Sequence, residues 1–559
     1  MRITACLLAA IACGGPMRPR DVRASARGGA VEVSWRSTAV ASRVQLADLD
    51  SGAPVGDPVV VRGSRAVLSG SASGVWVDAL PGGRAVGVVG AGDEGGTGAR
   101  WQIFAPWDFR RGALSATFPD LGSAERLGVL LVNYAGPDGA VADVTIEGAS
   151  DAPAAPAQFA PDMGAAFSAL HEVVRAREAV LALEAPAPTE QVQERSSFCV
   201  VRGLDFSHHV RKPVTLAVAT AHASIYLDDD DLGEYEGPVL QPLAQAFEDR
   251  VWPAITSAFG TLTDVDGDGK LLVLITHELG AHLNGGWLIG YFGNADLVRA
   301  RDDSAQCTAG GSNHAEIVYL NDPRNGAANG YAAADLFGAV YPATLAHELQ
   351  HLLNFAHRCV WRPCDGAEET WINEALSKVA EDLAGYGWNV AGGRAEGAAY
   401  LGHPSGEMRG YDGRSLTLWE GDPIGNYQGA HSFLRLFTDR AGQDLPGRIA
   451  SGAGGVFGLE SALGIPLPMA MAQWASALLL SNEPGSPYSF SGSAWSPLHE
   501  RLRHLDTRAA GPVSLRHDGI AAMMSGPGLG APARVTVRSR EETPPYVVVV
   551  RASAQLPAQ

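Results

Sequence analysis

The sequence feature that most constrains the fold is the motif HELQH at residues 347–351, followed 23 residues later by Glu374. Apolar residues recur around this motif at a spacing of three to four, which predicts an amphipathic helix with a buried stripe. On that helix His347 and His351 lie one turn apart, so both imidazoles project from the same face. This spacing allows two nitrogens to bind one tetrahedral zinc ion. The chain is therefore expected to fold so that one helix presents two histidines to a metal.

A second motif supplies the remaining ligand. Residues 371–377 (WINEALS) open a stretch rich in alanine and leucine, which predicts a second helix that carries Glu374. A carboxylate as third ligand leaves the fourth zinc position for water, as catalysis requires. Glu348 lies between the histidines, where it can take a proton from that water and return it to a leaving amine. The sequence therefore predicts a zinc hydrolase with His347, His351 and Glu374 as metal ligands and Glu348 as general base.

A rival third ligand is His357, because residues 347–357 also fit the longer pattern HExxHxxNxxH of a metzincin-type protease. In an unbroken helix His357 would lie about 240° round from His351 and point away from the metal. A break at Asn354, a residue that tolerates left-handed geometry, would bring it back. Met408 would then form the methionine turn of a metzincin. We expect the helix to run intact past Asn354.

A similar stretch at residues 277–282 (HELGAH) serves as an internal comparison. Its two histidines are five residues apart, so they diverge on a helix. It also follows a strand-like run at residues 271–275. We do not expect this stretch to bind zinc.

The N-terminus has the pattern of a bacterial export signal. Arg2 precedes an apolar run at residues 3–12, which is too short to span a bilayer. Small residues before Cys13 resemble a lipobox, in which this cysteine would be lipidated. We expect a protein exported from a bacterial cell, either lipid-anchored to the envelope through Cys13 or secreted. No later stretch is unbrokenly apolar over the roughly 18 residues that a transmembrane helix needs.

Four cysteines remain outside the signal region, an even number that suits disulfides in an exported protein. We expect Cys359 to pair with Cys364, which closes a small loop, and Cys199 to pair with Cys307. The sequence has no Cys-x-x-Cys pair, which argues against a cysteine-based zinc cluster.

Composition divides the chain into six segments. These are a signal and lipobox at 1–13, a tether at 14–29, a sandwich-like β-rich domain at 30–150, a linker with a helix at 151–197, a metallopeptidase domain at 198–482 and a β-rich region at 483–559. The predicted fold class is α+β, a zincin domain flanked by β-rich regions. Residues 14–197 are open to two interpretations, a removable pro-segment or an accessory domain.

Seven short segments follow one another in a specific order and spacing. They are 223–229 (ASIYLDD), 263–270 (TDVDGDGK), 290–292 (GYF), 312–320 (SNHAEIVYL), 347–355 (HELQHLLNF), 371–374 (WINE) and 380–386 (AEDLAGY). In these segments the region from about residue 217 to 442 resembles the hyicolysin family of zinc metallopeptidases. The resemblance implies a zincin fold of the gluzincin type and endopeptidase activity. It also implies that His347, Glu348 and His351 form the zinc site, with Glu374 as the further ligand.

Three aspartates suggest a second metal. Asp264, Asp266 and Asp268 resemble the first half of an EF-hand loop, and calcium prefers such clusters of oxygen atoms. The last position of such a loop is Ile275 here instead of glutamate, so the motif is incomplete. The alternatives are a calcium site and an acidic, glycine-rich turn before a strand.

Peptide hydrolysis also requires a donor to the developing oxyanion. Tyr427 and His431 are four residues apart on a predicted helix and share a face, so either is a candidate. Glu381 and Asp382 are both candidates for orienting a ligand histidine. The sequence does not choose within either pair.

The charge balance limits the partners. The formal net charge is −19, from 61 acidic and 42 basic residues, whereas nucleic-acid binders carry basic patches. We therefore expect protein or peptide substrates and no nucleic acid. The remaining alternative is a non-catalytic surface lipoprotein that binds a partner, and the presence of the general base Glu348 argues against it.

Overall fold

The computed structural model describes most, but not all, of the chain. The described parts are seven strands between residues 20 and 90, then residues 101–149, 186–189, 195–387, 415–418, 423–480 and 510–553, with short gaps at 120, 135, 203–207, 232–236, 281–287, 308–310, 329–330, 363–367, 527 and 531. Cys13 with the predicted signal, His282, Cys364 and Met408 therefore lie outside the described residues. Within them the fold is α+β, as predicted.

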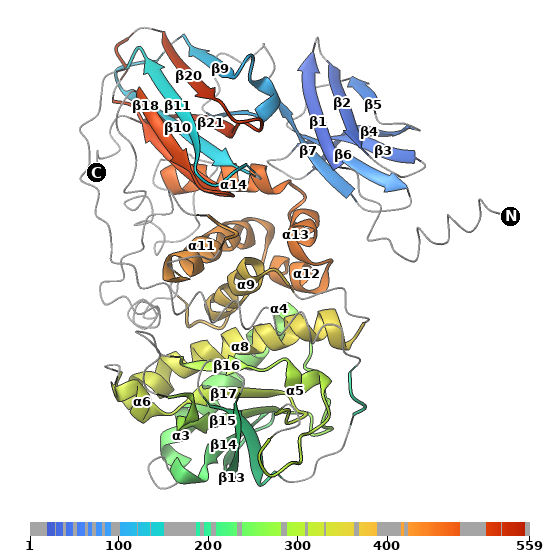
Figure 1. Ribbon diagram of the computed structural model, residues 1–559, viewed down its shortest axis with the longest axis vertical. Coiled ribbons are helices and arrows are strands. Elements are labelled where there is room, and N and C mark those ends of the chain that lie inside the picture. Colours follow the sequence, from blue (N-terminus) through green and yellow to red (C-terminus); the bar gives the residue numbers. More distant parts are fainter. Residues whose placement is uncertain are drawn as a thin grey trace, which may run out of the picture.

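The first seven strands form a sheet of their own, in the order β4-β3-β6-β7-β1-β2-β5 (Figure 1). Only β1 and β7 pair in parallel. The strands are β1 Arg20–Arg27, β2 Ala30–Arg36, β3 Ala41–Asp48, β4 Ala53–Val61, β5 Arg65–Ser69, β6 Gly74–Leu80 and β7 Arg84–Gly90. The segment predicted as a tether, 14–29, thus contains β1. Its composition gave no sign of a strand, because the strand is defined by backbone pairing with β2.

A β-sandwich is built from two distant parts of the chain. One sheet has the order β19-β10-β21-β8 and the other β18-β11-β20-β9, and all their strands are antiparallel. The strands are β8 Trp101–Phe104, β9 Ala113–Phe118, β10 Glu125–Asn133, β11 Ala140–Glu147, β18 Ala510–Leu515, β19 Gly519–Met524, β20 Ala533–Ser539 and β21 Tyr546–Ser553. From composition, these strands are predicted to lie in two separate regions, 30–150 and 483–559. Each sheet draws strands from both, because pairing partners far apart in sequence leave no local signal.

The central domain, residues 195–480, is built on a six-stranded sheet of order β12-β13-β14-β15-β17-β16. Strands β14, β15 and β17 are parallel, and the others pair antiparallel. The strands are β12 Ser197–Val201, β13 His209–Ala219, β14 Ala223–Asp228, β15 Leu271–Thr276, β16 Gly290–Phe292 and β17 Ile317–Asn321. The parallel strands are buried along their whole length, which is typical of strands covered on both faces. The short strand β16 forms one edge, next to helix α8.

The described helices of the central domain include those that carry the candidate site residues (Figure 1). They are α3 Gly237–Ala246, α4 Trp252–Phe259, α5 Ala295–Val298, α6 Pro323–Ala328, α7 Ala333–Asp335, α8 Tyr341–Phe355, α9 Thr370–Leu383, α11 Pro423–Ala441, α12 Leu445–Ser451, α13 Gly455–Leu463 and α14 Leu467–Leu480. Helix α8 packs against β16, β17 and α9, and α9 packs against α11. The candidate site therefore lies between α8, which borders the edge strand β16, and the helices α9 and α11.

Helix α14 joins the central domain to the sandwich. It contacts β10 and β21, and its side chains belong to the same hydrophobic cluster as those of α8 and α9. Among the described helices, none is by itself long and apolar enough to cross a membrane. Helix α13 and residues 467–478 of α14 meet the length and composition criteria only together, as a pair bent by 66°.

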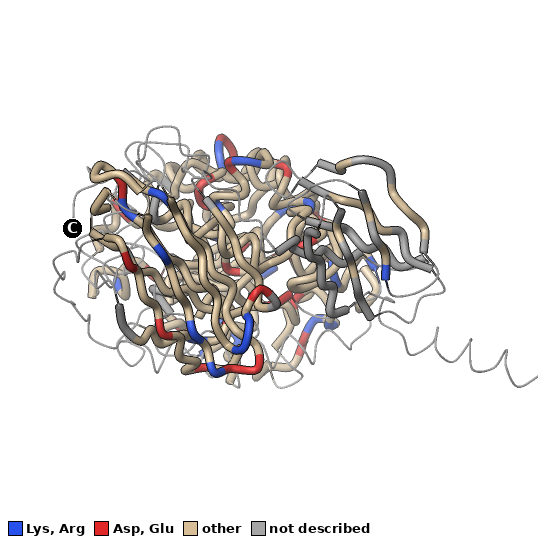
Figure 2. The backbone as a smooth tube through the Cα atoms, turned by 90° about the horizontal axis from the view of Figure 1, so that it is seen from above, with Lys and Arg blue, Asp and Glu red and all other residues tan. Residues whose placement is uncertain are grey.

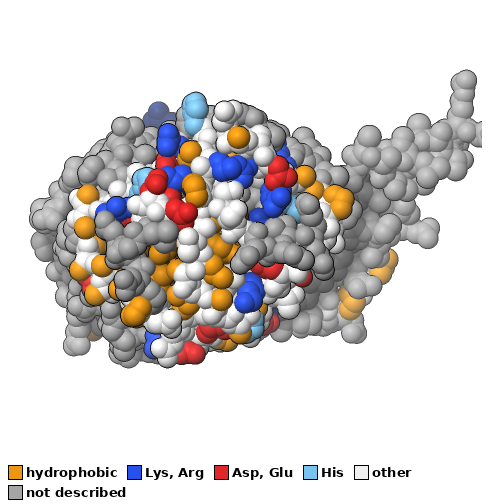
Figure 3. All heavy atoms as spheres, turned by 90° about the horizontal axis from the view of Figure 1, so that it is seen from below, with side chains coloured by type: hydrophobic (Ala, Val, Ile, Leu, Met, Phe, Trp, Pro, Cys, Tyr) orange, Lys and Arg blue, Asp and Glu red, His pale blue; other side chains and the backbone are white. Residues whose placement is uncertain are grey.

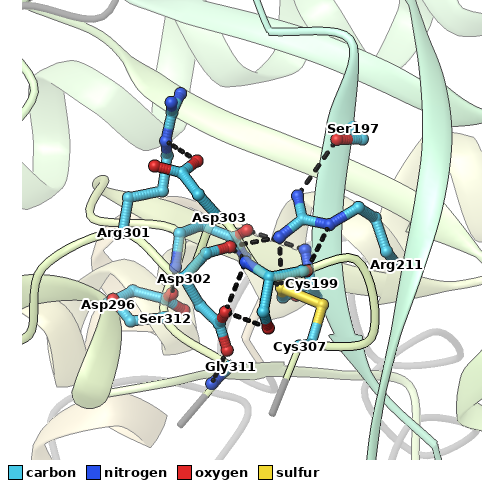
Figure 4. The surroundings of a disulfide bond; sticks show 12 residues. Ser197, Cys199, Arg211, Asp296, Arg301, Asp302, Asp303, Cys307, Gly311 and Ser312 are labelled. Atoms are coloured by element: carbon cyan, nitrogen blue, oxygen red, sulfur yellow. Dashed lines mark hydrogen bonds and ion pairs between the residues drawn. A yellow bond between two sulfur atoms is a disulfide. The ribbon is translucent and has the colours of Figure 1, made fainter. Parts of the chain in front are cut away.

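Cys199 and Cys307 form a disulfide, which confirms one predicted pair (Figure 4). The bond ties β12 to the loop between α5 and β17. Arg211 lies beside it and donates hydrogen bonds to Cys199 Sγ at 3.3 Å and to the carbonyl oxygen of Ser304 at 3.0 Å. Cys359 is also disulfide-bonded, and the cysteine predicted to be its partner lies outside the described residues.

Charged residues of both signs are interspersed along the described backbone, as the view from above shows (Figure 2). On the face seen from below, hydrophobic side chains gather in the middle (Figure 3). The exposed large hydrophobic residues include Leu216 on β13 and Val239 on α3. Along the described backbone, acidic and basic positions are mixed instead of separated into regions of one sign.

Candidate metal centre

Helix α8 presents the HELQH motif from a buried position. Pro342 lies in its first turn, where the missing N–H would have no helical partner. The predicted stripe, which includes Leu345, Leu349 and Leu352, is fully buried in the core. Because this stripe fixes the rotation of the helix, the histidines of the motif face helix α9.

The three residues predicted as metal ligands meet between α8 and α9, in what is here called the ligand cluster. Nε2 of His347 lies 3.2 Å and Nε2 of His351 lies 3.4 Å from Oε2 of Glu374. One ligand atom of each residue lies within 4.8 Å of the other two. Their side chains are only 6, 14 and 10% exposed. The structure thus brings together all three residues that the sequence singles out.

Glu381 holds the far side of the His347 ring. Its Oε1 lies 2.8 Å from Nδ1 of His347, and its Oε2 accepts a hydrogen bond from Lys378. Burial acts to lower the pKa of His347, but hydrogen bonds with Glu374 and Glu381 outweigh it and raise that pKa to about 10. Glu381 thereby orients the ring so that Nε2 faces the cluster. Lys378 was not among the predicted site residues, although its i, i+3 spacing to Glu381 is typical of an ion pair on a helix.

Glu348 lies on the adjacent face of α8, beside the ligand cluster. Its side chain is buried, and burial raises the pKa of this carboxyl group, although the nearby His347 and His351 act in the opposite direction. It also accepts a backbone hydrogen bond from Phe292, on the edge strand β16. A carboxylate between two imidazoles and a sheet edge is well placed to receive a proton.

His357 does not join the ligand cluster. Helix α8 includes Asn354 and continues into a π-helical turn, Ala356–Val360. Nε2 of His357 lies 2.6 Å from the carbonyl oxygen of Phe259, and its ring packs edge-on against Trp361. The helix therefore runs intact past Asn354, and His357 points away from the motif histidines.

The two oxyanion candidates on α11 have different surroundings. The ring centroid of Tyr427 lies 6.3 Å from that of His347. His431 is buried, and its Nε2 lies 2.7 Å from Oδ2 of Asp382, which also accepts a hydrogen bond from Arg435. Burial acts to raise the pKa of Asp382, but His431 and Arg435 outweigh it and lower that pKa. Tyr427 thus lies next to the ligand cluster, whereas His431 pairs with Asp382 and so links α11 to α9.

The predicted calcium loop is organised by protein contacts. Asp266 forms a buried ion pair with Arg195 at 2.7 Å, and Asp264 and Asp268 each accept a backbone hydrogen bond within the turn. Asp264 and Asp266 lie near Glu316, whose pKa burial raises to about 7. Asp268 does not belong to that group. The calcium prediction for the three aspartates therefore gains no support, because Arg195 already supplies the positive charge.

A second group of charged side chains, here called the second cluster, surrounds the His-Glu pair that the sequence analysis set aside. Asp228, at the end of β14, lies close to His277 and Glu278, which follow β15. Nζ of Lys212 lies 3.4 Å from Oδ2 of Asp228 and 3.1 Å from Oε1 of Glu278. Glu278 also pairs with Arg202 at 2.7 Å. The second cluster thus contains its own cations.

Comparison with known proteins gives a partial similarity. No family model matches the chain. Over 207 residues it is 26% identical to the neutral metalloprotease ShpI of Staphylococcus hyicus. The aligned part is 35% of this chain and 41% of that protein, so the chain spans less than half of the relative's length. The similarity supports a distant relationship to the metallopeptidases, and the narrower resemblance to the hyicolysin family stays a prediction.

Proposed function

We propose that this relative of metallopeptidases is a zinc-dependent endopeptidase that hydrolyses peptide bonds in proteins. The observation that carries the proposal is the spacing of the ligand atoms. Ligands bound about 2.0–2.2 Å from a tetrahedral zinc ion lie about 3.4 Å apart. The two Nε2–Oε2 distances in the ligand cluster are 3.2 and 3.4 Å. The distant similarity to a neutral metalloprotease supports the same chemistry.

The donor set suits catalytic zinc. Two imidazoles and one carboxylate leave a fourth position for water. When bound, zinc supplies Lewis-acid activation of that water and of the scissile carbonyl group. Glu381 and Lys378 hold His347 from behind, so its Nε2 remains directed at the metal position.

The proton transfer is assigned to Glu348. Its carboxylate accepts a proton from the attacking water and later delivers it to the leaving nitrogen. Tyr427 lies beside His347 and is assigned as the donor to the developing oxyanion. The buried His431 is held by Asp382 and is assigned to the contact between α9 and α11 instead.

The test is Glu348→Gln. Because the three ligands persist, the variant should bind zinc like the wild type, while hydrolysis of a protein substrate such as casein should fall by about 10²–10⁴-fold. Glu542→Gln, in an exposed turn before β21, is the control and should keep full activity. Activity of Glu348→Gln within about tenfold of the wild type, with zinc bound, would show that another group transfers the proton.

We further propose that the protein works outside the cytoplasm. The predicted signal at residues 1–13 and the disulfide between Cys199 and Cys307 support this location, since disulfides persist in oxidising compartments. The lipid anchor at Cys13 stays a prediction from the sequence.

A further inference from the structure

The sandwich places the N-terminal segment 101–149 at the centre of both of its sheets. Strand β10 lies between β19 and β21, and β11 lies between β18 and β20. Pairing is continuous along these strands, from Gly128 opposite Met524 to Asn133 opposite Gly519 in one case. Without residues 101–149, all four C-terminal strands would lose a neighbour, and the backbone groups facing it would lose their partners.

The core of the sandwich is shared in the same way. One hydrophobic cluster combines buried side chains of both segments. From the N-terminal segment it includes Phe118, Leu127, Val129, Leu131, Val144 and Ile146, and from the C-terminal segment Met523, Val535, Val537, Val547 and Val549. Neither segment has a second sheet of its own against which to bury this surface. The two segments therefore depend on each other for their stability.

The sandwich is also continuous with the core of the central domain. Leu130 and Val132 on the other face of β10 belong to the same cluster as Leu478 of α14, Leu349 of α8 and Leu376 of α9. Loss of segment 101–149 would therefore expose apolar surface on the domain that carries the ligand cluster.

The sheet of β1–β7 is different. Within the described residues, its strands pair only with one another. Its buried side chains, as far as the structure describes them, belong to none of the three hydrophobic clusters of the rest of the molecule; they include Val31, Val33, Val44, Leu46 and Leu68. Among the described side chains, this sheet thus shares no hydrophobic core with the rest, whereas segment 101–149 does.

We infer that residues 101–149 are a permanent part of the folded protein and not a removable pro-segment. When the chain is cut between this segment and residue 186, the N-terminal piece stays bound to β18–β21 as a non-covalent subunit. Residues 20–90, in contrast, can be removed without unfolding the rest. The inference does not depend on the proposed peptidase activity.

The test uses two full-length variants, each with one inserted recognition sequence for a site-specific protease. The first carries it between residues 90 and 101, and the second between residues 149 and 186. After native cleavage, size-exclusion chromatography should separate the N-terminal fragment in the first variant. In the second, both fragments should co-elute and part only in denaturant. Release of the fragment that contains 101–149, with the remainder still folded, would overturn the inference, as would retention of the fragment cut before residue 101.

A pair of point variants tests the same idea without cleavage. Val129→Asp places a charge in the shared core of the sandwich, whereas Val33→Asp does so in the sheet of β1–β7. The unfolding temperature of the central domain should fall by at least about 5 °C in Val129→Asp and stay unchanged in Val33→Asp. Equal effects of the two substitutions on the unfolding temperature of the central domain would contradict the inference.

Discussion

The ligand cluster and the second cluster both combine histidine with carboxylate, and they differ in the source of positive charge. In the second cluster the ammonium group of Lys212 lies among the carboxylates of Asp228, Asp230 and Glu278. In the ligand cluster, the carboxylate of Glu374 forms its ion pairs with the two imidazoles. Carboxylates that already surround an ammonium group are balanced by the protein. Imidazoles that converge on one carboxylate can bind a metal, which replaces the protons that they share with the carboxylate.

The largest expected effect separates the two clusters by metal content. Glu374→Ala should weaken zinc binding by more than about 100-fold, since even the residues that orient ligands contribute 10–100-fold. His277→Ala and His357→Ala should keep wild-type zinc content, measured by elemental analysis after dialysis. Zinc loss in His277→Ala would show that the second cluster binds the metal. Zinc loss in His357→Ala but not in Glu374→Ala would show that His357 is the third ligand, as in a metzincin-type protease.

The next effect concerns stability. Lys212→Met leaves Asp228 and Glu278 buried without this ammonium group, so the free energy of unfolding should fall by about 3–5 kcal/mol. Denaturant titration measures the change, and the folded fraction should retain its zinc. Lys270→Met, at a more exposed lysine, is the matched control and should change the free energy of unfolding by less than about 1 kcal/mol. A small effect of Lys212→Met would mean that the second cluster contributes little to folding.

A finer comparison sets two adjacent carboxylates of α9 against each other. Glu381→Gln should weaken zinc binding by about 10–100-fold, because Gln orients His347 less well. Asp382→Asn should lower stability through the contact with His431 but leave zinc affinity near the wild-type value. Competition with a chromogenic chelator measures both. The reverse pattern would show that Asp382 supports the metal.

The smallest effect is the dependence of stability on pH. Burial acts to raise the pKa of Glu278, but Arg202 and Lys212 outweigh it and hold that pKa below its ordinary value of 4.5. The stability that ionised Glu278 contributes is therefore present above pH 4.5 and is lost as the pH falls through the lower pKa of the folded state. In Glu278→Gln the unfolding free energy should decline less steeply in that acid range. An unchanged slope would show that other groups govern acid unfolding.

The ligand cluster could be predicted from sequence because its signals are local. His347 and His351 are one helical turn apart, and Glu374 lies on the next helix, so helical geometry and one packing contact bring them together. The same local geometry predicts that His357 faces away, as the structure describes. The expected α+β class followed equally from runs of residues with strand or helix spacing.

The rest depends on contacts between distant residues. Lys212, on strand β13, bonds to Glu278, which lies 66 residues later in the chain. The residues next to Glu278 in the sequence therefore give no sign that an ammonium group neutralises its charge. Arg195 likewise meets Asp266 across 71 positions and supplies the positive charge that one of the two alternatives assigned to calcium. The strands of the sandwich were predicted in two separate regions for the same reason. The sequence of a strand does not indicate which distant strand it pairs with.

The order of synthesis gives the sandwich a further consequence. The backbone N–H of Leu127 bonds to Ser525, which is 398 residues later in the chain. At about 5–20 residues per second, the ribosome adds that stretch in roughly 20–80 s. During this interval β10 and β11 are made but have no partners, and their apolar faces need protection from aggregation. The core that supports α8 and α9 closes only when β18–β21 have been synthesised, so a product truncated before these strands cannot complete it. The HELQH motif is therefore synthesised well before the fold around it can be completed.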